Sequence, residues 1–268
     1  MPELPDVEVY RRRLEQDARG RRVTEVHAPV TELLRETSPQ GLGRRLHGRS
    51  LTDVRRHGKY LFAGFSNDDD GDKHWLVLHF GMTGHLETYH DPDDAPDHAA
   101  LTLVLDNGLR ATYAATRKLG MIGTVDDADA FIAAQGLGPD ILGLDQSAFA
   151  ELASGRRGGV KCWLMNQEVM AGLGNVYSDE ALFRAGIHPK TAVSDLGDED
   201  LERLFTALNE VIAIAVEAEA DPSRMPDDFL LPHREEGARF ERCAGAVERI
   251  SACGRGAFYC PGRQGETR

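Results

Sequence analysis

The hydrophobic and polar positions divide this chain into four stretches. Residues 3–18 place apolar side chains at helical spacing with arginines on the other face, which predicts an amphipathic helix. Residues 23–125 carry short β-rich runs punctuated by Gly, Asp and Asn, a pattern typical of an antiparallel sheet or sandwich. Residues 147–220 are Ala- and Leu-rich segments broken by glycines, and residues 229–268 hold short strands. The predicted strands of the β-rich stretch are Val23–Val26, Tyr60–Phe65, Trp75–Phe80, Leu101–Leu105, Leu109–Tyr113 and Met121–Val125.

This order predicts an α+β fold in four parts. We expect residues 1–126 to form an N-terminal helix with a two-sheet antiparallel β-sandwich, and residues 127–146 to be a linker. Residues 147–228 are expected to form a helical domain that ends in a small β-hairpin at residues 229–268. The hairpin region is too short to hold a core of its own.

The charge distribution changes what the net charge implies. At −13, the net charge argues against a nucleic-acid-binding protein. Basic residues nevertheless outnumber acidic ones in residues 1–60, 156–190 and 229–268, and the excess of acid lies in the two blocks between them. If the basic blocks meet in the fold, a basic face can bind phosphates on an otherwise acidic protein.

The sequence predicts a protein without a membrane span or secretion signal. No apolar run is long enough to cross a bilayer, and the first residues are charged with no apolar segment. A cytoplasmic location is therefore expected. The cysteines are too few, and three of them too clustered, for a secreted disulfide framework. They are Cys162, Cys243, Cys253 and Cys260.

The first three residues carry candidate chemistry. Removal of Met1 before the small residue Pro2 leaves a free secondary amine at the chain start. Such an amine titrates near ~8, far below a lysine, so about a tenth of it is unprotonated at pH 7 and can attack a carbonyl-type carbon to give an iminium. Glu3 places a carboxyl beside it for proton transfer. The simpler interpretation, that Pro2 only stiffens the start of a helix, is favoured on these residues alone.

Several further motifs along the chain favour the catalytic interpretation of Pro2 over the structural one. The runs Met1–Glu8, His57–Leu61, Leu78–Leu86, Arg117–Gly120 and Lys161–Pro189 together resemble the formamidopyrimidine-DNA glycosylase / endonuclease VIII family. The resemblance spans nearly the whole chain and is weakest in residues 90–115 and 190–232. It implies that the helical domain is a helix–two-turn–helix domain and that the terminal hairpin is zinc-finger-like.

The resemblance implies three catalytic residues. Pro2 would be the nucleophile, Glu3 its acid partner, and Lys59 the β-turn lysine that reaches the DNA at the damaged nucleotide. From the residues alone, Lys59 belongs to a cationic turn before an apolar strand, which solvation explains equally well.

Three further residues would fill the gap left by an extruded nucleotide. An enzyme that flips a base out of the duplex needs an apolar wedge, and the resemblance implies Met82 and Leu119 for this role, with Arg117 contacting the orphaned base. The family usually has Asp-Pro before this arginine and an aromatic residue at position 119. Here Ala115–Thr116 and Leu119 stand instead, so the opposite-base preference does not carry over.

The helix–two-turn–helix motif implies phosphate binding. Gly172 and Gly174 would let the backbone approach a phosphate, and the following helix would supply N–H donors. Asn175 would bind the same phosphate, and Lys161 would add positive charge. Without the resemblance, a plain helical hairpin with a glycine turn explains these residues.

The terminal region resembles a zinc finger that has lost ligands. The family has two CxxC pairs separated by sixteen residues, and Cys243 and Cys260 keep this inner spacing. Phe240 and Arg263 occupy the outer positions. A structural zinc ion needs four N or S ligands, so a bound zinc is doubtful.

Cys253 or His233 could replace a lost ligand, although neither has the expected spacing. We expect instead a zinc-free finger held by packing of Phe240. Arg255 matches the arginine that the family's finger places beside the flipped nucleotide, so the hairpin is expected to bind DNA.

The resemblance implies a base-excision-repair DNA glycosylase with AP lyase activity. It would remove oxidised bases and nick abasic sites through a Schiff base on the N-terminal proline, with no cofactor needed for catalysis. The expected partner is damaged double-stranded DNA, and the expected state is a monomer. A non-catalytic reader of abasic or damaged DNA is the alternative. An N-terminal-proline tautomerase would leave the helix–two-turn–helix match unexplained.

Overall fold

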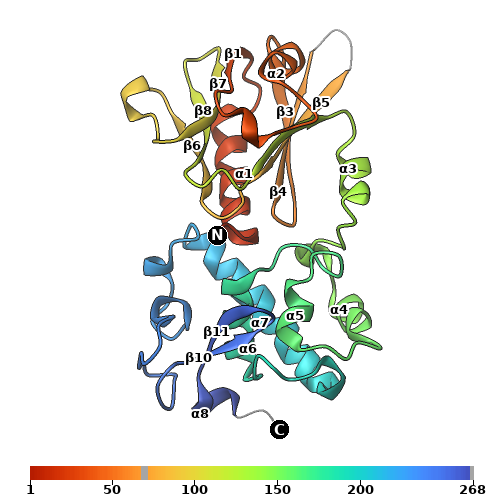
Figure 1. Cartoon of the computed structure of the whole chain (residues 1–268), viewed down its shortest axis with the longest axis vertical. Coiled ribbons are helices and arrows are strands. Elements are labelled where there is room, and N and C mark those ends of the chain that lie inside the picture. Colours follow the sequence, from red (N-terminus) through yellow and green to blue (C-terminus); the bar gives the residue numbers. More distant parts are fainter. Residues whose placement is uncertain (68–71, 266–268) are drawn as a thin grey trace. The chain divides into compact units, whose positions relative to one another are not determined.

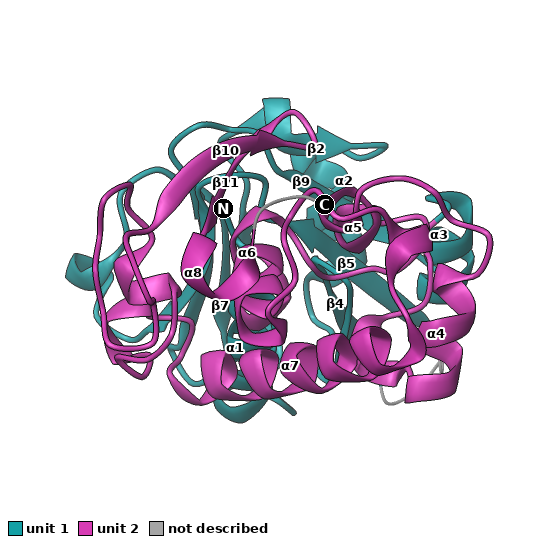
Figure 2. Cartoon of the chain, turned by 90° about the horizontal axis from the view of Figure 1, so that it is seen from below, with its two compact units in different colours: residues 1–2, 6–136 teal, residues 3–5, 137–268 magenta. Residues whose placement is uncertain are grey.

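The computed structural model describes residues 1–67 and 72–265, which form two compact units. Unit 1 comprises Met1–Pro2 and Asp6–Gly136, and unit 2 comprises Glu3–Pro5 and Leu137–Arg268 (Figure 2). The chain therefore passes between units three times: before Glu3, after Pro5 within its first helix, and after Gly136. The division at residue 136 lies inside the predicted linker, and the terminal hairpin belongs to unit 2 rather than standing apart.

Unit 1 contains two β-sheets whose strands are mostly antiparallel (Figure 1). A four-stranded sheet has the order β1-β7-β8-β6, and a five-stranded sheet has the order β2-β9-β5-β4-β3. The pairing is antiparallel except between β2 and β9, which run parallel. The elements are α1 (Leu4–Ala18), β1 (Val23–His27), η1 (Thr31–Leu33), β2 (Leu34–Arg35), α2 (Pro39–Leu46), β3 (Ser50–His57), β4 (Tyr60–Ser66), β5 (Lys73–His79), β6 (Gly84–Tyr89), η2 (Pro92–Asp94), β7 (Ala99–Leu105), β8 (Arg110–Ala115), β9 (Met121–Val125) and α3 (Ala128–Ala134).

The core of unit 1 lies between these sheets. Apolar residues at alternate positions of β4 and β5 meet those of β7 and β8, and Val7 and Leu14 of α1 join the same cluster. This alternation is the one that the sequence predicts, because every second side chain of a strand points to the same face. On the other face of the five-stranded sheet, Phe62 and Trp75 pack with α3.

The structure confirms the α+β sandwich and each of the six predicted strands, and it adds three more. Strand β2 has only two residues, which is too short to show a pattern in the sequence. The sequence analysis also missed β3 and β6, each for a physical reason. In β3 the register shifts between Leu51 and Asp53, so the buried residues Leu51 and Val54 lie three apart and the alternation is hidden. In β6, Leu86 is the one large buried apolar residue.

Unit 2 is built around helix α6. Residues of α5, α6 and α7 share one apolar core, to which Leu4 from the first helix also contributes. Hairpin β10–β11 packs beside α6, with Phe183 at the centre of a smaller cluster (Figure 1). The elements are η3 (Ile141–Gly143), α4 (Gln146–Ala153), α5 (Val160–Met165), α6 (Asn175–Ala185), η4 (Val193–Asp195), α7 (Asp198–Glu217), η5 (Pro222–Arg224), η6 (Leu231–His233), β10 (Glu248–Ala252), β11 (Arg255–Tyr259) and α8 (Pro261–Gln264).

Within residues 1–67 and 72–265, no helix is both long and apolar enough to cross a membrane.

Candidate active site

Glu3 is held at the N-terminus of α6. Its two carboxylate oxygens accept hydrogen bonds from the backbone N–H groups of Gly174 at 2.8 Å, Val176 at 2.8 Å and Tyr177 at 3.3 Å. A helix leaves its first N–H groups without partners, and its dipole favours negative charge there. The N-cap residue Gly174 has no side chain that could cap the helix. The fully buried carboxylate of Glu3, near the start of the chain, caps it instead.

The two glycines before α6 make room for the first residues of the chain. A Cβ on Gly174 would lie 2.4 Å from Glu3 Oε1, and one on Gly172 would lie 2.6 Å from Leu4 Cδ1. Gly172 also has a φ of +131°, which side chains rarely adopt, and its carbonyl accepts a hydrogen bond from Leu4 N at 3.1 Å. The sequence assigned these glycines to phosphate approach; the structure gives each a steric role in seating Glu3 and Leu4.

Pro2 precedes this fixed carboxylate directly and is itself buried, whereas the Met1 residue before it is 42% exposed. Leu4 is anchored in the core of unit 2 on the other side of Glu3. The position of Glu3 is therefore set by backbone and side-chain contacts, and Pro2 is covalently bound to a residue with little freedom to move.

Lys59 lies in the tight turn that joins β3 to β4. Gly58, the residue before Lys59, takes a φ of +55° in this turn. Glycine adopts this left-handed conformation easily, so it suits this position of the turn. Burial and then the nearby Lys59 charge lower the pKa of His79 to about 4, so His79 is neutral at pH 7. The His79 ring lies 4.8 Å from the ring of Tyr60, centroid to centroid.

The two predicted wedge residues lie on neighbouring loops of unit 1. A Cβ on Gly81 would lie 2.5 Å from the Leu119 carbonyl carbon, so the loops are in close contact. The Arg117 N–H donates to Thr83 Oγ1 at 3.1 Å, which joins the loops a second time. Met82 is 42% exposed and Leu119 is 54% exposed, unlike most large apolar residues of the chain. Segments far apart in sequence thus present two apolar side chains together, with Arg117 exposed beside them.

Asn175 is the first residue of α6 and sits half-buried beside the Glu3-capped helix start. Its Oδ1 atom has no hydrogen-bond partner in the part of the chain that the structure describes. Amide oxygen and nitrogen exchange places when the group turns over, so this side chain can present a donor to a ligand.

Lys161 is placed differently from its predicted role. It is fully buried, its ammonium forms an ion pair with Asp179, and it donates to the Asn175 carbonyl at 3.5 Å. Burial lowers its pKa, and the Asp179 charge opposes that effect. With no exposed surface, Lys161 supports the start of α6 from within rather than offering its ammonium to a phosphate.

Asp179 is a buried residue that the sequence analysis missed. Besides Lys161, its carboxylate accepts hydrogen bonds from Arg234 Nη2 at 2.7 Å and from the Phe258 N–H of β11 at 3.1 Å. It therefore joins α5, α6 and the hairpin at one buried point. The available signal was two adjacent acids, Asp179 and Glu180, directly before the apolar run Ala181–Phe183 of the same helix.

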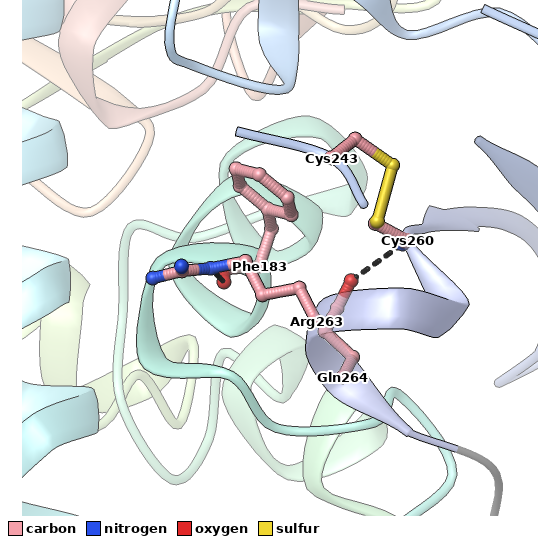
Figure 3. Close-up of a disulfide and its surroundings, with 5 residues drawn as sticks. All are labelled: Phe183, Cys243, Cys260, Arg263 and Gln264. Carbon is pink, nitrogen blue, oxygen red and sulfur yellow. Dashed lines mark hydrogen bonds between the residues drawn. A yellow bond between two sulfur atoms is a disulfide. The ribbon is translucent and has the colours of Figure 1, made fainter. Parts of the chain in front are cut away.

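The zinc-finger-like region is held without the expected ligand set. Cys243 and Cys260 form a disulfide, with their Cα atoms 5.8 Å apart (Figure 3). Arg263, at an outer position, donates to the carbonyls of Phe183 and Arg184 at 2.8 Å each and lies over the Phe183 ring. It thereby satisfies carbonyl groups near the C-terminus of α6.

Phe240, at the other outer position, packs as predicted. Its ring lies 5.5 Å from that of Phe183 and stacks on His233 at 4.5 Å, centroid to centroid. His233 is thus engaged in stacking, and Cys253 forms a second disulfide with Cys162 of α5. Among the described residues, no group of three or more His, Cys, Asp or Glu side chains is arranged to hold a metal ion. The donor set does not fit a tetrahedral zinc site.

The two disulfides correct what the sequence analysis expected of the four cysteines. The sequence favoured remnants of a zinc site at Cys243 and Cys260 and gave no pairing to Cys162 and Cys253, whereas the structure pairs all four. Arg255 follows the β10–β11 turn directly and is exposed, as a residue that binds DNA requires.

Comparisons with known proteins agree with this arrangement. Residues 1–122 match the model of the formamidopyrimidine-DNA glycosylase N-terminal domain, and residues 137–227 match that of the formamidopyrimidine-DNA glycosylase H2TH domain. Formamidopyrimidine-DNA glycosylases of Pelobacter propionicus and Geobacter metallireducens are 34% and 36% identical to the chain, and each alignment covers 97% of the chain and 98% of the relative.

Solved structures give the same result. Lactococcus lactis Fpg bound to DNA containing N7-benzyl-Fapy-dG superposes with a TM-score of 0.86 at 25% identity, covering 99% of this chain and all of that one. The Lactococcus lactis enzyme in complex with DNA that contains an abasic site matches equally well, with a TM-score of 0.86. The chain therefore belongs to the formamidopyrimidine-DNA glycosylase family of base-excision-repair enzymes.

Proposed function

We propose that this chain is a bifunctional DNA glycosylase and AP lyase that uses the amine of Pro2 as its nucleophile. The observation that carries the proposal is the Glu3 carboxylate, fixed by three backbone N–H donors directly beside Pro2. A fixed carboxylate next to a secondary amine provides both a proton donor or acceptor and a nucleophile at one place.

The proposed reaction begins once Met1 has been removed and the damaged nucleotide has left the stack. The Pro2 nitrogen attacks the sugar C1′, and the base leaves with its bonding electrons and takes up a proton from solvent. The Glu3 carboxylate takes the proton from the Pro2 nitrogen and delivers it to the ring oxygen O4′ as the C1′–O4′ bond breaks, which opens the sugar and leaves an iminium. The resulting iminium acidifies the C2′ protons. Loss of one of them expels the 3′ phosphate by β-elimination, and a second elimination would release the 5′ phosphate.

Exposed residues of unit 1 support the DNA-binding part of the proposal. Met82 and Leu119 are exposed apolar side chains on touching loops, which suits a wedge that fills the vacated place in the duplex. Arg117 beside them would contact the orphaned base. Lys59 would bind a phosphate near the damaged nucleotide.

In unit 2, we assign phosphate contacts to Asn175 and Arg255. The Asn175 side chain has an atom without a partner among the described residues, and Arg255 stands exposed at the hairpin turn. Lys161, Gly172 and Gly174 then act indirectly, by shaping the start of α6. We also propose that the finger works without zinc, and that the enzyme acts in the cytoplasm, where its DNA substrate lies.

The proposal is tested by cleavage of a 5′-labelled duplex that carries one abasic site. We expect wild-type protein to cut the strand and to leave elimination products, and Pro2→Gly protein, whose N-terminal amine is primary and unrestrained by a ring, to bind the duplex and to cut it far more slowly. Pro5→Ala is the matched control, because it changes a proline of the same helix start without touching the amine. Binding without cleavage by wild-type protein would support a non-catalytic damage reader instead. Metal analysis of the same preparation tests the zinc-free finger, for which we expect less than one zinc ion per chain.

A further inference from the structure

The two disulfides of unit 2 differ in what they join and in how accessible they are. Cys243 is 6% exposed, Cys260 is fully buried, and their bond closes a loop within the finger. Cys253 is exposed and Cys162 is half-buried, and their bond connects helix α5 to the hairpin turn. The Cα atoms of this second pair lie 5.2 Å apart although 91 positions separate the residues.

The turn that carries Cys253 is an unusual place for a cysteine. Ala252 pairs with Arg255, so the hairpin is closed by two residues, Cys253 with a φ of +55° and Gly254 with a φ of +66°. Such a turn prefers Asn or Gly at its first position, because a side chain there is crowded. A cysteine at this position costs conformational energy relative to Asn or Gly. Its sulfur is the atom that joins the turn to helix α5.

The disulfide fixes the end of the hairpin from which Arg255 projects. Farther along β11, the Phe258 N–H is bonded to the buried Asp179, which attaches the body of the hairpin to α6. Arg263, which follows β11, also donates to carbonyls of α6. These contacts hold the hairpin at the end away from its turn, and the Cys162–Cys253 bond attaches the turn itself, two residues before Arg255. The bond therefore restricts motion of the turn that the other contacts would allow.

We propose that Cys162 and Cys253 are positioning residues for Arg255, and that a dithiol reductant can release them. This inference rests on the proposed DNA-binding role of Arg255. In the oxidised protein the turn is fixed, and Arg255 meets a backbone phosphate with little loss of conformational entropy. Reduction transfers two electrons and two protons from the dithiol, which itself closes to a disulfide, and leaves two protein thiols. A thiolate must reach a sulfur atom to react, so the exposed pair is reduced before the buried Cys243–Cys260 pair.

The first test locates the reducible bond. Protein is treated with a limiting amount of dithiothreitol and alkylated with iodoacetamide, and the modified cysteines are mapped by peptide mass spectrometry. We expect alkylation at Cys162 and Cys253, with Cys243 and Cys260 unmodified. Alkylation of all four cysteines without any reductant, or of the buried pair first, would overturn the proposal.

The second test measures whether the bond acts through Arg255. For cleavage of an abasic duplex, we expect limited reduction or the C162S/C253S variant to raise KM roughly tenfold, while the single-turnover rate at saturating DNA stays unchanged. The Cys253→Gly variant should behave in the same way, because it supplies the better turn residue and removes only the bond.

The same reduction experiment is then repeated with the R255A variant. In this variant, limited reduction should leave KM unchanged, because the side chain that the disulfide positions is absent. A similar rise of KM in both backgrounds, or a fall in the single-turnover rate alone, would contradict the positioning role. A failure of wild-type protein to form any cleavage product would refute the proposed enzyme function instead. Fluorescence anisotropy with a duplex that contains a tetrahydrofuran abasic analogue would then still report the effect of reduction on DNA binding, with no change counting against the inference.

Discussion

The start of helix α6 and the pair of wedge loops in unit 1 are built in opposite ways. At the helix start, Glu3 is fully buried and accepts three hydrogen bonds, and Gly174 has no room for a side chain. On the wedge loops, Met82 and Leu119 are large apolar side chains that remain 42% and 54% exposed. The first region is fixed before DNA arrives, whereas the second presents surface that gains burial only on binding.

The difference separates two kinds of requirement. A group that transfers protons must already be in place, because reorganisation during the reaction raises the barrier. A wedge contributes only when a nucleotide has left the stack, and an apolar side chain exposed until then gains free energy when it is buried. Mutations in the two regions should therefore affect different measurements.

The largest effect is expected at Gly174. In Gly174→Ala the new Cβ would lie 2.4 Å from Glu3 Oε1, so the carboxylate must turn away from the helix start. We expect the single-turnover cleavage rate to fall roughly 100-fold, since a displacement of about 1 Å at a reacting group costs that much. Gly143→Ala is the matched control, because a Cβ at Gly143 meets no atom within 4 Å. A normal rate in Gly174→Ala would show that Glu3 does not need this position.

Burial of the Glu180 carboxyl in α6 should make the free energy of unfolding depend on pH. Burial raises the pKa of Glu180 to about 7, although the N–H groups of Leu230 and Leu231 donate to it. Because the folded pKa lies above the unfolded value, this group's contribution is complete below about pH 4.5 and is lost as the pH rises to about 7. The loss amounts to up to ~3 kcal/mol.

Urea unfolding of wild-type protein and of Glu180→Gln at several pH values measures this component. The difference in unfolding free energy between the two proteins should shift in favour of Glu180→Gln as the pH rises through this range. A difference that does not vary with pH would contradict the raised pKa.

The wedge residues should affect binding and leave stability unchanged. We expect Met82→Ala and Leu119→Ala each to weaken binding of an abasic duplex roughly tenfold, because less apolar surface is buried in the complex. The melting temperature should not change, since exposed side chains contribute little to folding. Leu142→Ala removes a side chain of similar exposure, 45%, from unit 2, and should alter neither quantity. Equal losses in all three variants would mean that the position of the apolar surface is unimportant.

The smallest effect is expected at Asn175, which belongs to the fixed region but is proposed to contact DNA. Asn175→Ala should weaken binding of damaged and undamaged duplex by similar factors, several-fold at most, because a phosphate contact carries no base information. Competition binding with the two duplexes measures this ratio. A loss confined to the damaged duplex would place Asn175 at the lesion rather than at a phosphate.

Most of the fold could be predicted from the sequence because alternation and helical spacing are local signals. Strand β3 was missed because its register shifts near Leu51, which removes the alternation. The division at residue 136 falls inside the predicted linker, but the assignment of Glu3–Pro5 to unit 2 escaped prediction, because it depends on contacts with residues some 170 positions away.

The site shows the same division. Motif matches identified Glu3, Met82, Leu119 and Arg255 at positions that the structure fixes or exposes in keeping with the proposed roles. The burial of Lys161 against Asp179 could not be predicted, because a lysine near a glycine-rich turn is equally compatible with an exposed position. The disulfides were missed because pairing depends on distances that spacing along the chain does not determine.

Borohydride trapping on a duplex with one abasic site tests the central claim most directly. Reduction of an iminium joins protein and DNA covalently, so only a protein that forms the intermediate yields an adduct. We expect an adduct for wild-type and Pro5→Ala protein, a greatly reduced amount of it in Pro2→Gly, and attachment at Pro2 when the wild-type adduct is mapped by mass spectrometry. No adduct from wild-type protein that has lost Met1 and binds the duplex, or an adduct that persists in Pro2→Gly at the wild-type level, would contradict it.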